Sequence, residues 1–190
     1  PGGYFIINGT ERVLISMEDL APNRVTVEIN KRYAKRTEVA KIFSQKDGMR
    51  KPLNVEKRRD GMLMVKISTA GTTAIPVVLL MRALGIENDQ EVFQTVAGPT
   101  ETFKYIVANL NEVNDNEEYA VQSMLEAHEW LQKKFAAGQQ KEYREQRVNQ
   151  LLDRELLPHL GDQPTDRKKK AIFLGRIVRQ VLEMALTNRE

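Results

Sequence analysis

The sequence predicts an α+β fold in which an N-terminal antiparallel β-rich part is followed by a helical part. The first observation is that short β-branched and aromatic runs, separated by turn dipeptides, fill residues 1–70. The second is that apolar residues from 75 onward recur every three or four positions, the period of an amphipathic helix. Because the strands precede the helices instead of alternating with them, parallel βαβ units are not expected.

The β-rich part begins with a predicted strand-turn-strand unit over residues 2–13, in which Asn8-Gly9 can reverse the chain. The dipeptides Asp47-Gly48 and Asp60-Gly61 predict further turns, because Gly adopts positive φ readily. The strands expected after the first unit are 24–29, 39–43, 53–55 and 62–67.

Helix boundaries in the second part are predicted from capping residues. Pro76 suits a first helical turn, Gly85 suits a helix stop, and Asn88 with Glu91 is an N-terminal signal. The later helices are expected at 101–110 after Thr100, from Asp115 to Gly138, at 139–157 and at 165–187. The apolar stripes of these helices are expected to face the core, and they include Val107, Met124, Leu125, Ile172, Leu174 and Val178.

Composition limits the classes of protein and site that are possible. A chain of 190 residues suits one domain, or one domain with a small lead-in. The absence of cysteine excludes disulfides, zinc-thiolate sites and cysteine nucleophiles. No apolar run reaches about 18 residues, so no membrane partner is expected and the sequence has the pattern of a soluble protein.

Charge is strongly segregated along the chain. Residues 24–66 hold 13 Lys and Arg against 5 Asp and Glu, whereas residues 87–129 hold 1 against 10. Residues 130–190 are basic again, with 13 against 8. Blocks of both signs suit a protein that meets phosphate on one side and another protein elsewhere, although a solvated surface would have the same pattern.

No catalytic constellation is present in the sequence, and neither a catalytic residue nor a metal site is predicted. There is no phosphate-binding GxxxxGK loop, HExxH helix or GxSxG elbow. His128 lies on an apolar helix stripe and is interpreted as a core or boundary residue. His159 follows Pro158 at a helix end, where bonding to a free carbonyl is expected.

Basic side chains near predicted turns and at the start of the last helix are the candidate DNA contacts. Lys57, Arg58 and Arg59 precede the Asp60-Gly61 turn and are expected on an exposed tip. Cations in the first turn of a helix oppose its macrodipole, so an anionic partner would explain the basic run 167–170. The alternative is that solvent screens these charges. The candidates are Arg50, Lys51, Lys57, Arg58, Arg59, Lys168 and Lys169.

Acidic side chains in the helical part are the candidate contacts for protein partners. They fall in a region with almost no positive charge, which would repel DNA and attract basic protein surfaces. The alternative is a solubilising face without a partner. The candidates are Asp115, Glu117, Glu118 and Glu126.

Three stretches of the sequence form a recognisable set. The first is GGYFIINGTERV at 2–13, the second is IPVVLLMRALGI at 75–86, and the third joins LLPHL at 156–160 to RKKKAIFLG at 167–175. In residues, order and spacing they resemble the second-largest, β-type subunit of archaeal and eukaryotic DNA-directed RNA polymerases. The resemblance covers nearly the whole chain and implies a fragment of the larger subunit.

The resemblance implies that residues 1–20 end the protrusion domain and that residues 21–190 form the lobe. It implies a wall of the DNA cleft near downstream duplex DNA and a docking surface for initiation and elongation factors. The partners would be the other polymerase subunits, and the Mg²⁺ of nucleotidyl transfer would be bound elsewhere, leaving this fragment non-catalytic and without a cofactor. The location would be cytoplasmic and nucleoid-associated in an archaeon, or nuclear in a eukaryote.

A free-standing adaptor is the alternative function. It would combine a basic nucleic-acid-binding β module with an acidic helical docking surface, and it would need no polymerase. A coding sequence that continues into the rest of a β-type subunit would exclude it.

Overall fold

The computed structural model of this chain describes residues 23–30, 37–67, 71 and 73–187. Within them an antiparallel sheet is followed by helices, which confirms the α+β class. The strand-turn-strand unit predicted at 2–13 lies outside the described residues, so it stays a prediction.

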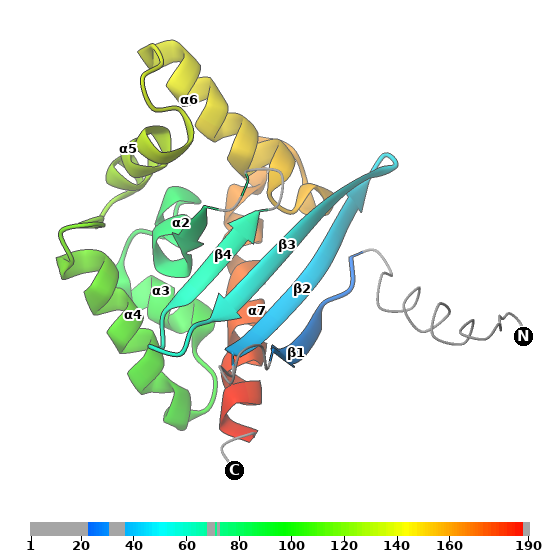
Figure 1. The fold of residues 1–190 in the computed structure, drawn as a ribbon, viewed down its shortest axis with the longest axis vertical. Coiled ribbons are helices and arrows are strands. Elements are labelled where there is room, and N and C mark those ends of the chain that lie inside the picture. Colours follow the sequence, from blue (N-terminus) through cyan, green and yellow to red (C-terminus); the bar gives the residue numbers. More distant parts are fainter. Residues whose placement is uncertain (1–22, 31–36, 68–70, 72, 188–190) are drawn as a thin grey trace, which may run out of the picture.

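The sheet is a five-stranded antiparallel meander in which each strand pairs with the next one along the chain (Figure 1). The two predicted turns are confirmed, since Gly48 and Gly61 have φ values of 78° and 93°. Lys46 pairs with Met49 across the first of these turns. The strands are β1 (Thr26–Asn30), β2 (Thr37–Lys46), β3 (Met49–Lys57), β4 (Leu63–Ile67) and β5 (Ala74–Pro76).

The helices follow the sheet in the chain and lie mainly behind and to one side of it (Figure 1). Short 3₁₀ turns precede α4 and α7, and a π-helical turn, η4 (Leu151–Glu155), extends α6. The helices are α2 (Val77–Ala83), α3 (Asp89–Val96), α4 (Phe103–Asp115), α5 (Met124–Phe135), α6 (Lys141–Gln150) and α7 (Arg167–Thr187).

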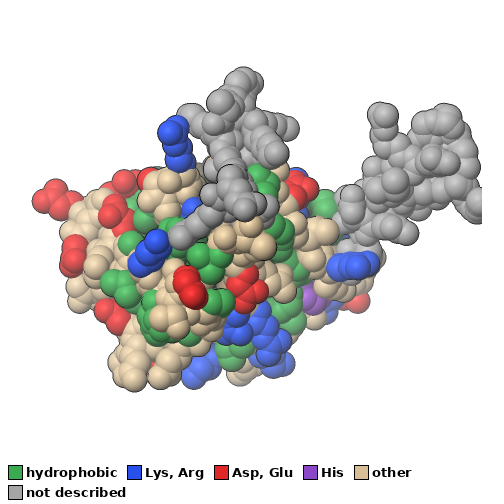
Figure 2. Space-filling view, turned by 90° about the horizontal axis from the view of Figure 1, so that it is seen from below, with side chains coloured by type: hydrophobic (Ala, Val, Ile, Leu, Met, Phe, Trp, Pro, Cys, Tyr) green, Lys and Arg blue, Asp and Glu red, His purple; other side chains and the backbone are tan. Residues whose placement is uncertain are grey.

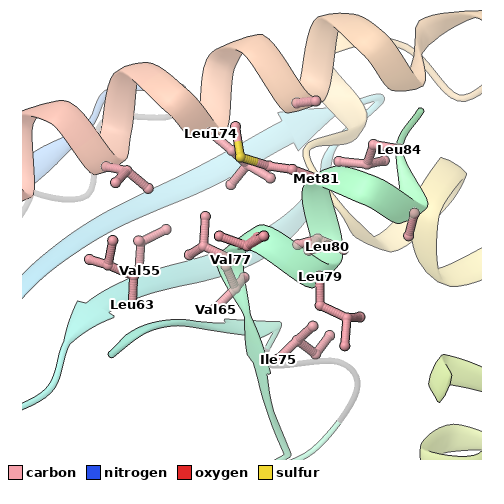
Figure 3. Close-up of a cluster of buried hydrophobic side chains, with 14 of the residues drawn as sticks. Val55, Leu63, Val65, Ile75, Val77, Leu79, Leu80, Met81, Leu84 and Leu174 are labelled. Carbon is pink, nitrogen blue, oxygen red and sulfur yellow. The ribbon is translucent and has the colours of Figure 1, made fainter. Parts of the chain in front are cut away.

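The core lies where α7 and α2 pack against one face of the sheet (Figure 3). Val55 and Val65 from the strands meet Leu174 of α7 and Met81 of α2, and all four are at most 1% exposed. The other face of the sheet carries cross-strand ion pairs, for example Lys41 with Glu28 at 2.5 Å. This alternation of apolar and charged residues follows from the two-residue period of a strand.

Several helix boundaries differ from those predicted. The acidic segment after Asp115 is a turn, and α5 begins at Met124 behind the N-cap Ser123. The buried stripe of α5 passes through Ala127, Trp130 and Leu131, which leaves Met124 and Leu125 in its first turn 41% and 69% exposed. The strand β5 was missed because three residues carry too little pattern to separate them from the helix that follows.

Two other residues that were predicted to point inward are exposed. Val107 on α4 is 45% exposed, and Ile172 on α7 is 43% exposed. The buried stripe of α7 passes through Lys170, Leu174 and Val178 instead, so Ile172 falls just outside it. The hydrophobic pattern alone could not show that a lysine would take a core position.

The segment predicted as one helix at 139–157 is interrupted. The α-helix α6 ends at Gln150 and widens into the π-helical turn η4, after which Leu157 adopts a left-handed φ of 46°. Pro158 then starts a 3₁₀ turn, because its fixed φ suits a first helical position.

Candidate nucleic-acid and partner-binding surfaces

The turn between β3 and β4 presents two of the candidate DNA contacts. Arg58 and Arg59 are exposed on this turn. Its shape is fixed by Asn109 of α4, whose Oδ1 accepts from the Leu63 amide at 2.8 Å and whose Nδ2 donates to the Gly61 carbonyl at 3.0 Å. The two arginines are therefore held on a rigid turn that α4 supports.

Lys57 does not lie on the exposed tip as predicted. Its side chain is 13% exposed, its Nζ lies 3.7 Å from a Glu38 carboxylate oxygen, and it stands 5.1 Å from the Tyr105 ring centroid. The reason is that Lys57 ends β3 and faces α4. Lys104, which the sequence did not indicate, is exposed and lies 5.2 Å from the same ring centroid. We call Arg58, Arg59 and Lys104 the turn-end patch.

The hairpin turn between β2 and β3 presents a second pair of candidates. Arg50 is exposed, but its guanidinium lies 5.6 Å from the Phe43 ring centroid and its Nε donates to Gln45 at 3.4 Å. Lys51 is half-buried and lines a surface pocket of about 310 Å³ together with Arg154. Both side chains are thus partly engaged within the fold.

The start of α7 lies near this hairpin, because residues 158–162 bind β2. The Asp162 carboxylate pairs with Lys46 at 3.3 Å, and the Ser44 hydroxyl lies 2.6 Å from His159 Nδ1. Lys168 and Lys169 are exposed here, and Lys169 pairs with Asp166 at 3.3 Å. We call Arg50, Lys51, Lys168 and Lys169 the hairpin-end patch.

Two of the four basic residues at the start of α7, Arg167 and Lys170, are bound within the fold. Arg167 forms a bidentate pair with Asp153, at 2.7 and 2.9 Å. Lys170 is fully buried, and its ammonium donates to the Leu152 and Asp153 carbonyls at 2.8 Å each. These two cations bind acceptors at the end of the preceding helix, which accounts for their position without an anionic ligand.

The predicted DNA contacts form two separate patches, because the hairpin and the β3–β4 turn lie at opposite ends of β3 (Figure 1). A strand of nine residues spans about 27 Å, at roughly 3.3 Å a residue. One rigid duplex would have to lie along the sheet to contact both patches.

Three of the four candidate partner-binding residues gather around one pocket. Glu117, Glu118 and Glu126 line a surface pocket of about 450 Å³ with Tyr119 and Trp130. We call these five residues the acidic pocket. The fourth candidate, Asp115, is exposed at the end of α4 and is not part of the lining. Acidic side chains gather at the left of Figure 2, on the side where α3 and α4 lie in Figure 1.

The wall of the acidic pocket is built on a rigid loop. Arg82 of α2 is fully buried and binds the Val121 carbonyl at 2.5 Å, and it also binds Asn114 and Asp89. The Trp130 indole N–H donates to the Glu118 carbonyl at 3.1 Å, which fixes the ring against the loop. The loop therefore keeps its shape without a bound partner.

The acidic pocket and the turn-end patch are neighbours across Tyr119. Burial raises the pKa of Tyr119, the Glu118 carboxylate raises it further, and the nearby Arg58 charge lowers it. The two surfaces predicted for DNA and for protein are therefore close together in this part of the molecule, and a ligand at one would sense the charge of the other.

Both histidines bind neighbouring groups of the fold. His128 is half-buried with Nε2 2.9 Å from the Ala83 carbonyl, which confirms a boundary residue, and burial lowers its pKa. His159 binds Ser44 and not a carbonyl, because its backbone N–H and Nδ1 both face that hydroxyl. Among the described residues, no group of three or more His, Asp or Glu side chains could hold a metal ion. No described helix is both long and apolar enough to cross a membrane.

Residues 21–190 match the family described as RNA polymerase Rpb2, domain 2. The chain belongs to this family. The Rpo2N subunit of the RNA polymerase of Halobacterium salinarum is 41% identical over 194 residues, and that of Methanocaldococcus jannaschii is 42% identical over 184. The Rpo2 subunit of Saccharolobus solfataricus is 38% identical over 190 residues. These matches confirm the resemblance to the second-largest polymerase subunit.

The chain spans only part of these curated relatives. The alignments cover 100%, 97% and 100% of the chain, but 36% of each Rpo2N subunit and 16% of Rpo2. The Rpb2 domain 2 match therefore concerns one section of a longer kind of subunit.

The stretches that resemble the Rpb2 family have structural roles where the structure describes them. Arg82 binds the loop of the acidic pocket, and Gly85 ends α2 with a φ of 104°. Gly175 allows α7 to approach α3, because a Cβ atom there would lie 2.5 Å from the Thr95 carbonyl oxygen. In these stretches Arg82, Gly85 and Gly175 thus serve the packing and the turns of the fold.

Proposed function

We propose that this chain forms part of a wall of the DNA cleft in a DNA-directed RNA polymerase and a docking surface for transcription factors. Membership of the Rpb2 domain 2 family favours this function over a free-standing adaptor. The observation that carries the proposal is the division of exposed charge between the basic turns of the sheet and the acidic pocket beside α5.

The turn-end patch is the proposed contact with downstream duplex DNA. Arg58, Arg59 and Lys104 are exposed, and guanidinium and ammonium groups bind phosphate oxygens without reading sequence. The hairpin-end patch is a weaker candidate, because Arg50 and Lys169 already contact Phe43 and Asp166. The remaining polymerase subunits are the other proposed partners.

The acidic pocket is the proposed contact with initiation or elongation factors. Its carboxylates repel the DNA backbone and attract basic side chains of a protein. In an archaeal cell, a chain with these contacts would be found with the polymerase on the nucleoid.

We further propose that the chain takes no part in the chemical step and binds no cofactor. Two-metal phosphoryl transfer needs clustered carboxylates, and the acidic residues of the acidic pocket line an open surface beside two lysines, Lys133 and Lys134. The Mg²⁺ ions of the polymerase would be bound by another part of the enzyme. Template-dependent nucleotide incorporation by this chain alone, lost on mutating one of its own carboxylates, would contradict this.

The two surfaces can be separated in an assembled archaeal polymerase that carries this domain. Arg58→Glu with Arg59→Glu should lower the salt concentration at which factor-free elongation complexes dissociate. Glu117→Lys with Glu118→Lys should weaken factor binding and leave factor-free elongation intact. Each double variant is the control for the other, and loss of factor-free elongation in the second variant would overturn the assignment of the acidic pocket.

A further inference from the structure

The first half of α5 exposes apolar side chains at a position where the fold does not need them. Leu125 is 69% exposed and Met124 is 41% exposed, while the buried stripe of the same helix passes through Ala127, Trp130 and Leu131. Because Glu129 lies one turn after Leu125, these residues form a short ridge, which we call the α5 ridge: Met124, Leu125 and Glu129.

The α5 ridge is bordered by a pocket on each side. On one side lies a pocket of about 280 Å³, lined by Met124, Leu125 and His128 of α5 and by Glu145 and Asn149 of α6. On the other side lies the acidic pocket, whose lining includes Glu129 of the ridge. An exposed apolar residue between two hollows is the arrangement expected for a surface that receives side chains from a partner.

The acidic pocket has a floor suited to a cation. The rings of Tyr119 and Trp130 lie 5.9 Å apart between centroids, and the Lys134 ammonium already lies 5.4 Å from the Trp130 ring centroid. A cation over an aromatic face is attracted by the ring quadrupole, and neighbouring carboxylates strengthen this attraction. Trp130 is 8% exposed and its ring already holds one cation, so a positive group of a partner would have to replace Lys134 there.

We infer that the α5 ridge and the acidic pocket together bind a basic protein segment that carries an apolar residue next to Arg or Lys. The apolar side chain would pack on Leu125 and Met124, and the cation would enter the acidic pocket. Carboxylates around the pocket disfavour DNA at this surface. The inference deepens the proposed factor-docking function and rests on it.

The binding experiment uses this chain and two synthetic peptides of one composition. Both peptides contain Arg, Leu and Ala, but only one arranges Leu and Arg on a single helical face. Trp130 is the only tryptophan of the chain and lines the acidic pocket, so its fluorescence reports binding directly. The patterned peptide should change this fluorescence in a saturable manner, and the scrambled peptide should bind at least about fivefold more weakly.

Variants of the chain separate the two halves of the surface. Leu125→Ser should lower the affinity for the patterned peptide about tenfold, because the apolar contact is lost. Replacing Glu117, Glu118 and Glu129 together by Gln should lower this affinity about fivefold at low salt and by a smaller factor at high salt. Met49→Ser is the matched control, since Met49 is 59% exposed on the distant hairpin and should not affect binding.

Three results would overturn the inference. They are equal affinity for both peptides, an unchanged affinity of the Leu125→Ser variant, and self-association of the chain that the same variants abolish, which would make a second copy the occupant. Loss of factor binding by the charge-reversed polymerase, with no peptide binding by the chain, would leave the proposed function standing and remove this inference alone. If the chain bound the peptide but the charge-reversed polymerase still bound factors normally, the peptide-binding surface would stand and the proposed factor-docking function would be removed.

Discussion

Cationic side chains bind the C-terminal ends of two helical segments in this molecule. Arg179 donates to the Val96 carbonyl at 3.3 Å and to the Thr95 carbonyl at 3.5 Å, at the C-terminus of α3. Lys170 does the same for the carbonyls that end the helical segment before α7. The last carbonyls of a helix have no partner within it and carry its negative dipole end, so a cation there satisfies both requirements.

Lys170 gives a pH-dependent stability. Burial lowers its pKa from 10.5 to about 8, and the Asp153 carboxylate only partly opposes this. Below pH 8 the Lys170 amine is protonated in both the folded and the unfolded chain, so folding has to bury a full positive charge. Between about pH 8 and 10.5 the unfolded chain binds more protons at this site, so the contribution of Lys170 to the free energy of unfolding rises with pH.

We therefore expect the difference in unfolding free energy between the unmodified chain and Lys170→Met to grow over this pH range in favour of lysine. Urea unfolding followed by Trp130 fluorescence at several pH values measures this difference. Lys168→Met, two residues away and exposed, is the control and should give a difference that does not change with pH. Parallel pH curves for Lys170→Met and the unmodified chain would contradict the prediction.

Gly175 is a second position where one residue decides the packing. A Cβ atom at this site would lie 2.5 Å from the Thr95 carbonyl oxygen, which is backbone and cannot rotate away. Gly→Ala in a helix interior normally stabilises by about 1 kcal/mol, whereas overpacking costs about 1–3 kcal/mol. We expect Gly175→Ala to lower the thermal midpoint, and an increase would show that α3 and α7 separate easily.

At the scale of elements, turns were easier to predict than helix starts. Asp47-Gly48 and Asp60-Gly61 were identified because their glycines supply positive φ, and this is a local property. The predicted start of α5 was wrong. Asp115 with Glu118 and Ser123 with Glu126 are both acceptable capping pairs, and the sequence alone does not choose between them. The choice between them depends on Arg82, which binds the Val121 carbonyl from another helix and holds the loop open.

The two possible starts of α5 give a direct test. The Ser123 hydroxyl accepts from the Glu126 amide at 3.1 Å, so Ser123→Ala should lower the free energy of unfolding by about 1 kcal/mol. Asp115→Ala should have less than half that effect, because the residue ends α4 and starts no helix. Denaturant unfolding of the two variants decides between the alternatives, and a larger effect at Asp115 would contradict the structure.

At the scale of the whole molecule, the sequence predicted which kinds of charge occur but not which of them are available. Lys169 and Lys170 are adjacent and identical in type, yet one is exposed and the other is fully buried. Lys57 and Arg58 are also adjacent cations, but Lys57 is largely buried against α4 while Arg58 is exposed. Helix phase and the position of a neighbouring element decide this, and neither can be obtained from local composition.

The turn-end patch and the acidic pocket are less separated in the fold than their positions in the sequence predict. The basic and acidic blocks are distant in the sequence, but the fold brings Arg58 close to Tyr119 at the edge of the acidic pocket. A duplex that contacts the turn-end patch would therefore approach carboxylates on one side. The number of phosphates it can reach is small for this reason, and binding by this chain alone should be weak.

The salt dependence of DNA binding tests this arrangement. We expect a Kd at or beyond about 10⁻⁴–10⁻⁶ M for non-specific duplex DNA at physiological salt, and a slope of log K against log salt that falls by about 0.9 for each lost phosphate contact. Arg58→Gln with Arg59→Gln should reduce the slope by about 2, because both side chains are exposed. Arg50→Gln with Lys51→Gln should reduce it less, because Arg50 is engaged with Phe43 and Lys51 is half-buried.

Lys57→Met distinguishes a role of Lys57 in DNA binding from a role in stability, when it is measured in the same salt titration. Its ammonium pairs with Glu38 and lies over Tyr105, so this variant should lower the free energy of unfolding and leave the salt slope unchanged. Fluorescence anisotropy of a labelled duplex gives the slope, and denaturant unfolding gives the stability. If Arg58 and Arg59 could be replaced without changing the slope, while Lys57→Met reduced it, the duplex would contact the α4 side of the turn and the turn-end patch would have to be redrawn around Lys57.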